Sequence, residues 1–399
     1  MSEGDYMNIF NNRLQVPEGF KDFLPEEAYK KRYLEEKWIH LFKSWSYREI
    51  VSSSFEYYDT LTMNAGADTL SLLKTIGRGG HILALRPDMT SPIARLAATG
   101  LKDQKLPQRL FYLANVFRYG NEVQKGRHSE FYQAGVEFIG PKGSKADGEI
   151  IALAVEALET VGLQSFQIGL GHMEIIKGLL KQLNGADDIE REMKIKQALS
   201  HKNYVELAKL LNFKPQSIEE KIYRLITTQS NLDQAVANLK SIVTEAELEK
   251  PIKDLEGLAS SLKAYGVDQR VFVDFSILRD FDYYTGIVFE GYSECLGFPI
   301  CGGGRYDKLL GSFGNPNPAT GFAIGVERVL DALSREGSFL KEREIDYLIC
   351  GNKEYEIIKE AKLLRSKGYS VEVDLMNLSE EEAESYALEK GIKNIIKLF

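Results

Sequence analysis

A charged stretch from residue 175 to about residue 264 has helical character and few strand signals. On both sides of it lie short runs rich in aromatic and β-branched residues, separated by breaks that contain Gly, Asp or Lys. The stretch therefore predicts a helical insertion within a core that contains a sheet. We expect strands at residues 47–55, 82–85, 110–117 and 131–138, all in one sheet, at residues 166–169, and again at residues 271–275 and 285–292.

Helical periodicity marks segments that would cover this sheet. Apolar residues recur at three- and four-residue spacing through Tyr29, Tyr33, Trp38 and Phe42, which predicts a long first helix. Two further elements are expected outside the insertion: a helix at residues 147–160, and a strand followed by a helix at residues 321–333.

The last part of the chain changes to a regular alternation of strands and helices. This alternation predicts a small parallel α/β domain. A highly charged linker at residues 334–344 precedes it, so we expect a core of residues 1–334 and a C-terminal domain of residues 345–399. The expected elements are strands at residues 346–350, 370–374 and 394–398, and helices at residues 355–366 and 380–390.

Composition narrows the class of protein. An apolar fraction of 44% and a charged fraction of 27% are typical of a folded, soluble chain. The net charge of -8 provides no global attraction for nucleic acid. The three cysteines, Cys295, Cys301 and Cys350, lack zinc-ligand spacing, so we expect neither a disulfide nor a metal. No secretion signal or membrane-spanning run is evident, which predicts a cytoplasmic protein that needs no cofactor.

Four blocks of residues occur in a fixed order. They are residues 85–90 (LRPDMT); residues 117–133, with FR, GR and EFYQ; residues 279–286 (RDFDYYTG); and residues 302–307 (GGGRYD) followed by residues 321–328 (GFAIGVER). With the insertion between the second and third blocks, they resemble the histidyl branch of the class II aminoacyl-tRNA synthetases across nearly the whole chain. The resemblance implies an α+β fold, with an antiparallel sheet flanked by helices, a helical insertion and a small C-terminal α/β domain.

The resemblance also implies roles for particular residues in binding histidine. An α-ammonium group needs a carboxylate, an α-carboxylate needs a guanidinium or amide donor, and each imidazole nitrogen needs a hydrogen-bond acceptor or donor. The glycines at residues 302–304 would either allow a ligand close to the backbone or mark a bulge. The implied set is Asp88, Thr90 and Gln133 for the ammonium group, Arg279 for the carboxylate, Glu137 and Tyr284 for the ring, and Arg118, Arg127 and Arg328 as a vestigial nucleotide site.

The sequence departs from that of the synthetases at positions that contact ATP in those enzymes. Those enzymes place a glutamate two residues after the arginine of the second block, whereas this chain has Arg118-Tyr119-Gly120. They also carry a second arginine where this chain has Ser129. Because catalysis is sensitive to displacements of about 1 Å, a carboxylate moved along the loop cannot serve the same position. We therefore predict no catalytic residues and no aminoacylation activity.

The C-terminal domain departs as well. It stops earlier than the anticodon-binding domain of the synthetases and has no basic stripe with interleaved aromatic residues, so no specific tRNA partner is expected. This combination resembles the ATP phosphoribosyltransferase regulatory subunits. That family implies activation of a short catalytic subunit in the first step of histidine biosynthesis, feedback by L-histidine, and a homodimer within a hetero-oligomer, a hetero-octamer in that family. Class II domains pair through the long first helix and the strand after it, which would bring Tyr33, Trp38 and Tyr47 near the contact.

Two other functions remain open at this point. An active histidyl-tRNA synthetase is one, because Arg118, Arg127, Arg279 and Arg328 are all present. A stand-alone protein that adenylates or senses an amino acid is the other. The sequence does not show whether inhibitory histidine would bind the ancestral pocket or a subunit interface.

Overall fold

The computed structural model describes residues 14–63, 71–119, 129–184, 189–243, 248–278, 283–338 and 344–399. The chain forms two compact units, Met1–Phe339 and Leu340–Phe399. Among the described helices, none combines the length and the apolar character needed to span a membrane.

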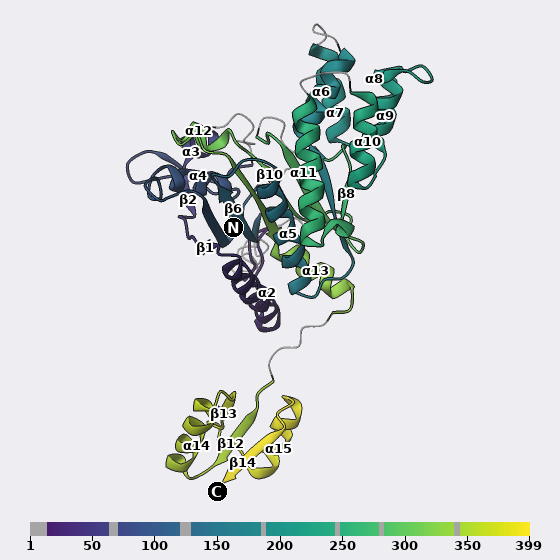
Figure 1. Ribbon diagram of the computed structural model, residues 1–399. Helices are drawn as coiled ribbons and strands as arrows, with labels where there is room; N and C mark the ends of the chain where they lie inside the picture. The colour runs from purple at the N-terminus through teal and green to yellow at the C-terminus, as the bar shows by residue number, and fades with distance from the viewer. Residues whose placement is uncertain are drawn as a thin grey trace, which may run out of the picture. The chain divides into compact units, whose positions relative to one another are not determined.

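An eight-stranded sheet forms the centre of the large unit (Figure 1). Its inner pairs are antiparallel, and the pairs β1–β5 and β7–β8 at its two edges are parallel. This mixed sheet with flanking helices confirms the expected class II synthetase-like α+β fold. In spatial order the strands are β1 (Arg48–Glu49), β5 (Gln108–Phe117), β6 (Glu130–Ile139), β11 (Ala319–Gly325), β10 (Pro299–Arg305), β9 (Ile287–Ser293), β7 (Phe166–His172) and β8 (Val271–Val273).

Successive side chains of the long strand β5 point to opposite faces of the sheet, so their contacts show what covers each face. Leu110, Tyr112 and Val116 pack in one cluster with residues of helix α4 (Thr90–Ala98). Phe111 points the other way, with its ring 5.6 Å from that of Phe42 in helix α2 (Pro25–Ser44). Since successive side chains of a strand alternate between faces, α2 and α4 cover opposite sides of the sheet.

The structure confirms the long first helix, α2, and a hydrogen bond from one of its side chains holds it to a neighbouring helix. The Trp38 indole donates a hydrogen bond to the carbonyl of Ala157 at 2.9 Å, in helix α5 (Ser144–Thr160). Trp38 and Tyr47 are both buried within the large unit. They therefore support the helix and cannot offer their own surface to a second copy of the chain.

A separate small sheet corrects one expectation. Residues 82–85 form β4 (Ile82–Leu85), which pairs antiparallel with β2 (Phe55–Tyr57) on one side and β3 (Lys74–Ile76) on the other. Both edges of β4 are thus occupied, so it cannot join the large sheet, and the expectation of a single sheet was wrong. The strand expected at residues 47–55 is likewise divided, between β1 and the start of β2.

The expected helical insertion is confirmed, and its helices group together in Figure 1. The sequence marks several of their starts. The side chains of Asn203, Ser217 and Asn231 each accept the backbone N–H three residues later, which satisfies a donor that a helix start leaves open. The helices are α6 (Met173–Asn184), α7 (Ile189–Ser200), α8 (Tyr204–Leu211), α9 (Ile218–Thr227), α10 (Leu232–Ile242) and α11 (Glu249–Tyr265).

The small unit is the expected parallel α/β domain. Its three strands pair in parallel in the order β13-β12-β14. Ile349 and Leu348, neighbours on the central strand, belong to two different apolar clusters, so the helices pack on opposite faces of the sheet. The elements are β12 (Tyr347–Gly351), α14 (Glu354–Ser366), β13 (Val371–Val373), α15 (Glu380–Glu389) and β14 (Asn394–Leu398).

Candidate functional site

Several of the candidate residues meet on the face of the large sheet that α4 covers. Gln133 and Glu137 both point to this face from β6, because residues two apart on a strand share a face. Asp88 and Thr90 lie at the start of α4, and Thr90 is hydrogen-bonded to Glu137. Two members of the implied set, Arg127 and Arg279, lie outside the described residues.

Glu137 is enclosed by protein, with only 2% of its surface exposed. Its carboxyl group accepts a hydrogen bond from the hydroxyl of Tyr306. Burial raises the pKa of Glu137 to about 8, against the hydrogen bonds from Tyr306 and Thr90, and the charge of Asp88 adds to the rise. Glu137 is therefore mainly a neutral carboxylic acid at pH 7, which can both donate and accept a hydrogen bond.

Two buried tyrosines, Tyr112 and Tyr306, and the partly buried Tyr283 surround this carboxyl group. The rings of Tyr283 and Tyr306 are stacked at 5.5 Å, and Tyr112 lies across Gly135, where an added Cβ would come within 2.5 Å of its hydroxyl. Burial is the main cause that raises the pKa of each tyrosine well above its usual value, and Glu137 contributes in each case. The tyrosines therefore remain uncharged hydrogen-bonding groups.

Two glycines make room for the residues expected to contact an imidazole ring. A Cβ at Gly321 would lie 2.1 Å from Oε2 of Glu137, and a Cβ at Gly304 would lie 2.9 Å from Cδ1 of Tyr284. The glycines at residues 302–304 are in a regular antiparallel ladder, and the register shift in β10 comes earlier, between Pro299 and Cys301. The glycine run is therefore not the bulge, and Gly304 serves to admit the ring of Tyr284.

The end of the site near α4 offers oxygen atoms. Oδ1 of Asp88 accepts the backbone N–H of Thr90 at 3.0 Å and that of Ser91 at 3.4 Å, which fixes the carboxylate at the start of α4. Oε1 of Gln133 is buried and accepts no hydrogen bond from the residues that the structure describes. A buried acceptor without a donor is costly, so this atom is suited to an N–H group of a ligand.

Arg86 of the first block and Arg118 of the second have different environments. Arg86 is buried, and its guanidinium donates to the backbone and side chain of Asn115 and to the carbonyl of Ser52, which ties three segments together. Arg118 is exposed, and its Nε donates to the carbonyl of Pro87 at 2.8 Å. Since Pro87 precedes Asp88, Arg118 lies beside the start of α4, where a guanidinium can meet an anionic group.

Arg328 lies on helix α13 (Val326–Arg335), which follows β11. Its guanidinium lies over the ring of Phe298 at 5.2 Å and donates to the carbonyl of Pro299. The preceding residue, Glu327, accepts the backbone N–H of Tyr132 at 2.9 Å and so holds α13 against β6. Arg328 is thus placed by contacts with the start of β10.

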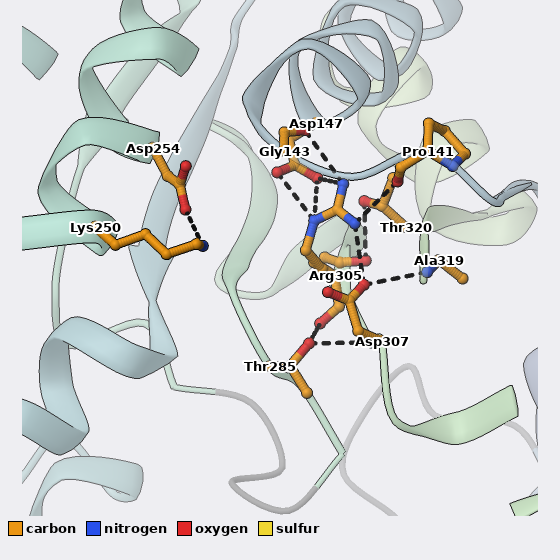
Figure 2. A network of polar contacts seen from close by, with 11 residues as sticks. Pro141, Gly143, Asp147, Lys250, Asp254, Thr285, Arg305, Asp307, Ala319 and Thr320 are labelled. Atoms are coloured by element: carbon orange, nitrogen blue, oxygen red, sulfur yellow. Dashed lines mark hydrogen bonds and ion pairs between the residues drawn. The ribbon is translucent and has the colours of Figure 1, made fainter. Parts of the chain in front are cut away.

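A buried ion pair between Arg305 and Asp147 lies at the centre of a network of polar contacts (Figure 2). Arg305 donates to Asp147 in α5 at 2.7 Å and to Asp307 at 3.0 Å, and Asp307 in turn accepts the backbone N–H of Ala319 at 3.2 Å. In the sequence, Tyr306 lies between Arg305 and Asp307. The backbone N–H of Thr285, next to Tyr284, donates to the carbonyl of Arg305 at 2.8 Å. The network therefore fixes the segments that bring Tyr306 and Tyr284 to the site.

The sequence predicted Glu137 as a site residue but not most of the residues that enclose it. Tyr283, Arg305 and Tyr306 lie within the four blocks but were assigned no role, and neither Tyr112 nor Asp147 was predicted to belong to the site. The only signal for Tyr112 was its place on an expected strand, since its position opposite Gly135 requires the register of β5 and β6. No group of three or more His, Cys, Asp or Glu side chains suited to a metal occurs within the described part of the chain.

Known proteins resemble this chain over nearly its full length. A family model described as histidyl-tRNA synthetase matches residues 19–329. ATP phosphoribosyltransferase regulatory subunits from Moorella thermoacetica and Desulforamulus reducens are 43% and 40% identical, over 96% and 95% of this chain and 97% and 94% of theirs.

Solved structures agree with these matches. A crystal structure from Bacillus halodurans, described as an ATP phosphoribosyltransferase regulatory subunit/histidyl-tRNA synthetase, has a TM-score of 0.85 and 32% identity over 96% of this chain and 97% of that one. A histidyl-tRNA synthetase from a Nostoc species has a TM-score of 0.81 over 96% of this chain and 91% of that one, and at 23% identity it shows the shared fold alone.

Proposed function

Because this chain belongs to the family of ATP phosphoribosyltransferase regulatory subunits, we propose that it activates the short catalytic subunit of that enzyme and transmits feedback by histidine in the first step of histidine biosynthesis. The observation that carries the proposal is similarity to such subunits along nearly the whole of both chains. In this role the chain has no catalytic residues of its own, and the catalytic subunit performs the phosphoribosyl transfer.

We assign the histidine sensor to the face of the sheet that bears Glu137. The neutral acid of Glu137 and the hydroxyl of Tyr284 suit the two ring nitrogens, since each can donate or accept. Asp88, Thr90 and the open acceptor on Gln133 suit the ammonium group. Arg279 completes the set as the partner of the carboxylate.

Arg118, Arg127 and Arg328 are proposed as remnants of a nucleotide site. Arg118 and Arg328 each donate to a backbone carbonyl, of Pro87 and Pro299, so both have contacts that do not depend on a nucleotide. Retention for structure accounts for them without ATP chemistry.

Feedback requires differential binding. Histidine inhibits only if it binds the inhibited state of the complex more tightly than the active state. A coupling of about 1 to 3 kcal/mol, which is common for allosteric pairs of sites, corresponds to roughly 5- to 150-fold changes in affinity. Tight binding to both states would have no regulatory effect.

The decisive experiment combines this chain with the short catalytic subunit. Co-purification of the two, and a rise in phosphoribosyltransferase activity when this chain is added, are the expected results. A catalytic subunit that neither binds this chain nor changes its activity would refute the proposal, and would favour a stand-alone protein that senses or adenylates an amino acid.

The sensor is tested separately within the same complex. Glu137→Gln should weaken recognition of the ring, and Arg279→Ala should remove the charge-assisted partner of the carboxylate at a cost of about 1.5 to 3 kcal/mol. Both should desensitise the complex and leave its uninhibited activity largely intact. Glu294→Gln, a change at an exposed position of the same unit, is the matched control. Normal calorimetric binding of histidine by both variants, with full inhibition, would place the sensor elsewhere, most plausibly at the interface with the catalytic subunit.

A histidyl-tRNA synthetase is the second candidate, favoured by the family model that matches residues 19–329. The sequence Arg118-Tyr119-Gly120 lacks the carboxylate that reads adenine in those enzymes, and Ser129 replaces a cation. We therefore expect no pyrophosphate exchange dependent on histidine and ATP, and no selective binding of histidine tRNA at ~150 mM salt, where non-specific contacts weaken. Robust exchange would establish the synthetase instead.

We further propose that the chain works in the cytoplasm as a homodimer within a hetero-oligomer, a hetero-octamer by analogy with the family. The long helix α2 and the strand β1 after it are the elements through which class II domains pair. Sedimentation of the isolated chain as a dimer, and of the complex at the mass of an octamer, is the expected result.

A further inference from the structure

One edge of the small unit bears exposed apolar side chains. Leu375 and Met376 follow the carboxyl end of β13 and are 87% and 77% exposed. Tyr355, in the first turn of α14 after the carboxyl end of β12, is 80% exposed. Because the carboxyl ends of parallel strands meet at one edge of a sheet, these three residues form a patch there, the carboxyl-edge patch.

The turn that presents this patch is held by hydrogen bonds. The backbone N–H of Asp374 donates to the carbonyl of Ile349 on the central strand at 2.9 Å. The Asp374 carboxylate then accepts the backbone N–H groups of Met376 and Leu378, both at 2.8 Å. Leu375 and Met376 therefore stand on a fixed turn, which lowers the entropy cost of binding a partner through them.

Carboxylates surround the carboxyl-edge patch. Exposed Glu354 and Glu356 lie in the first turn of α14, and exposed Glu381 lies in the first turn of α15. Of the cations at this edge, Lys397 is paired with Glu380 at 3.1 Å and with Glu384, and exposed Lys353 at the N-cap of α14 is outnumbered by the three carboxylates. The rim is thus acidic, which opposes the phosphates of a nucleic acid and favours a partner rimmed by lysine or arginine.

We propose that the carboxyl-edge patch is a docking surface for a protein, the catalytic partner subunit, through an apolar contact rimmed by basic residues. The assignment of this partner rests on the proposed function. Apolar side chains at the centre and charges at the rim are the usual arrangement of a protein–protein contact. The patch alone is small, so it contributes one part of a larger interface.

The test measures affinity of the full chain for the catalytic subunit by calorimetry. The variant is Leu375→Glu with Met376→Glu, both at exposed positions. The control is Leu388→Glu, because Leu388 is 83% exposed in the same unit and lies at the other end of α15, away from the patch. We expect at least a tenfold loss of affinity for the double variant, since each apolar side chain buried is worth more than about 1.4 kcal/mol, and no change for the control.

Salt and charge provide a second measurement. Association with the wild-type chain should slow as salt rises, and Glu381→Gln should weaken that dependence.

Equal affinities for the wild type, the double variant and the control would overturn the proposal while leaving the proposed function intact. A double variant that loses self-association in sedimentation and still binds the catalytic subunit would assign the patch to a second copy of this chain. Binding of RNA that the double variant abolishes would assign it to nucleic acid. A wild-type chain that fails to bind the catalytic subunit would refute the proposed function and, with it, this partner.

Discussion

The substitution Glu137→Gln should stabilise the large unit at neutral and alkaline pH. Glutamine has nearly the same shape, carries no charge, and can still accept the hydrogen bond from Tyr306. In the wild type the folded state holds a proton on Glu137 up to a pKa of about 8, whereas the unfolded chain releases it near pH 4.5. Keeping that proton at pH 7 costs about 3 kcal/mol, which is the upper limit of the stabilisation expected for the variant.

The pH dependence gives the sharper test. Between pH 4.5 and 8 the folded state binds more protons than the unfolded state, so this group lowers the wild-type free energy of unfolding as pH rises, by up to about 1.4 kcal/mol per pH unit. The variant lacks this component. The difference between the two proteins should therefore be small below pH 4.5, grow across the interval and level off above pH 8.

Urea unfolding followed by tryptophan fluorescence can measure this difference. The chain has two tryptophans, Trp38 and Trp45, both in the large unit, so the signal reports on the unit that contains Glu137. Glu294→Gln is again the control, because it removes an exposed carboxylate from the same unit. Parallel curves for Glu137→Gln and the wild type from pH 5 to pH 9 would show that Glu137 is not held neutral, and would refute the reasoning. A variant that is more stable at pH 8 yet binds histidine less tightly would show that the acid is kept for recognition at a cost in stability.

Three further results are expected. Asp147→Asn should destabilise the large unit by about 1.5 to 3 kcal/mol in urea unfolding, because it removes the buried anion that Arg305 contacts and leaves the more exposed Asp307 as its charged partner, and an effect below about 1 kcal/mol would contradict the role of this pair. Burial lowers the pKa of His172 to about 4, so the unfolded chain binds more protons between pH 4 and 6.5 and wild-type stability rises with pH across that window. His172→Gln should reduce this rise when unfolding is compared at pH 4.5 and pH 7, and an unchanged rise would show that His172 is not held neutral. The isolated chain should sediment as a dimer, and a monomer at micromolar concentration would count against pairing through α2.

Periodicity predicted the regular parts of the fold well. The strand at residues 110–117 and the helix α2 have strong local patterns, and the structure confirms them. The division of strands between two sheets was not predictable in the same way. Residues 82–85 carry an ordinary strand pattern, and only the pairing of β4 with β2 and β3 removes them from the large sheet. Helix α4 was also missed, because it is short and begins at Thr90, the last residue of the first block.

The residues of the candidate site were likewise predictable only in part. The family resemblance pointed to Gln133, at the end of the second block, and to Glu137, four residues beyond it. The contacts that set the properties of Glu137 come from segments far apart in the chain. Tyr306 reaches it from the residue after β10 and Thr90 from the start of α4, and no local pattern signals either contact. The raised pKa of Glu137 follows from burial and could not be read from the sequence at all.

The glycines beneath the site have an evolutionary consequence. A methyl group at Gly321 would meet the Glu137 carboxyl group and the carbonyl of Val136, and a methyl group at Gly304 would meet the carbonyl of Ile287 and the ring of Tyr284. Any glycine codon becomes an alanine codon by a single nucleotide change. If histidine is sensed here, as proposed, organisms selected on toxic histidine analogues should acquire resistance through alanine at Gly321 or Gly304, without altering any side chain that would touch the effector. In that case a single base change in either codon would be enough to release the pathway from feedback by histidine.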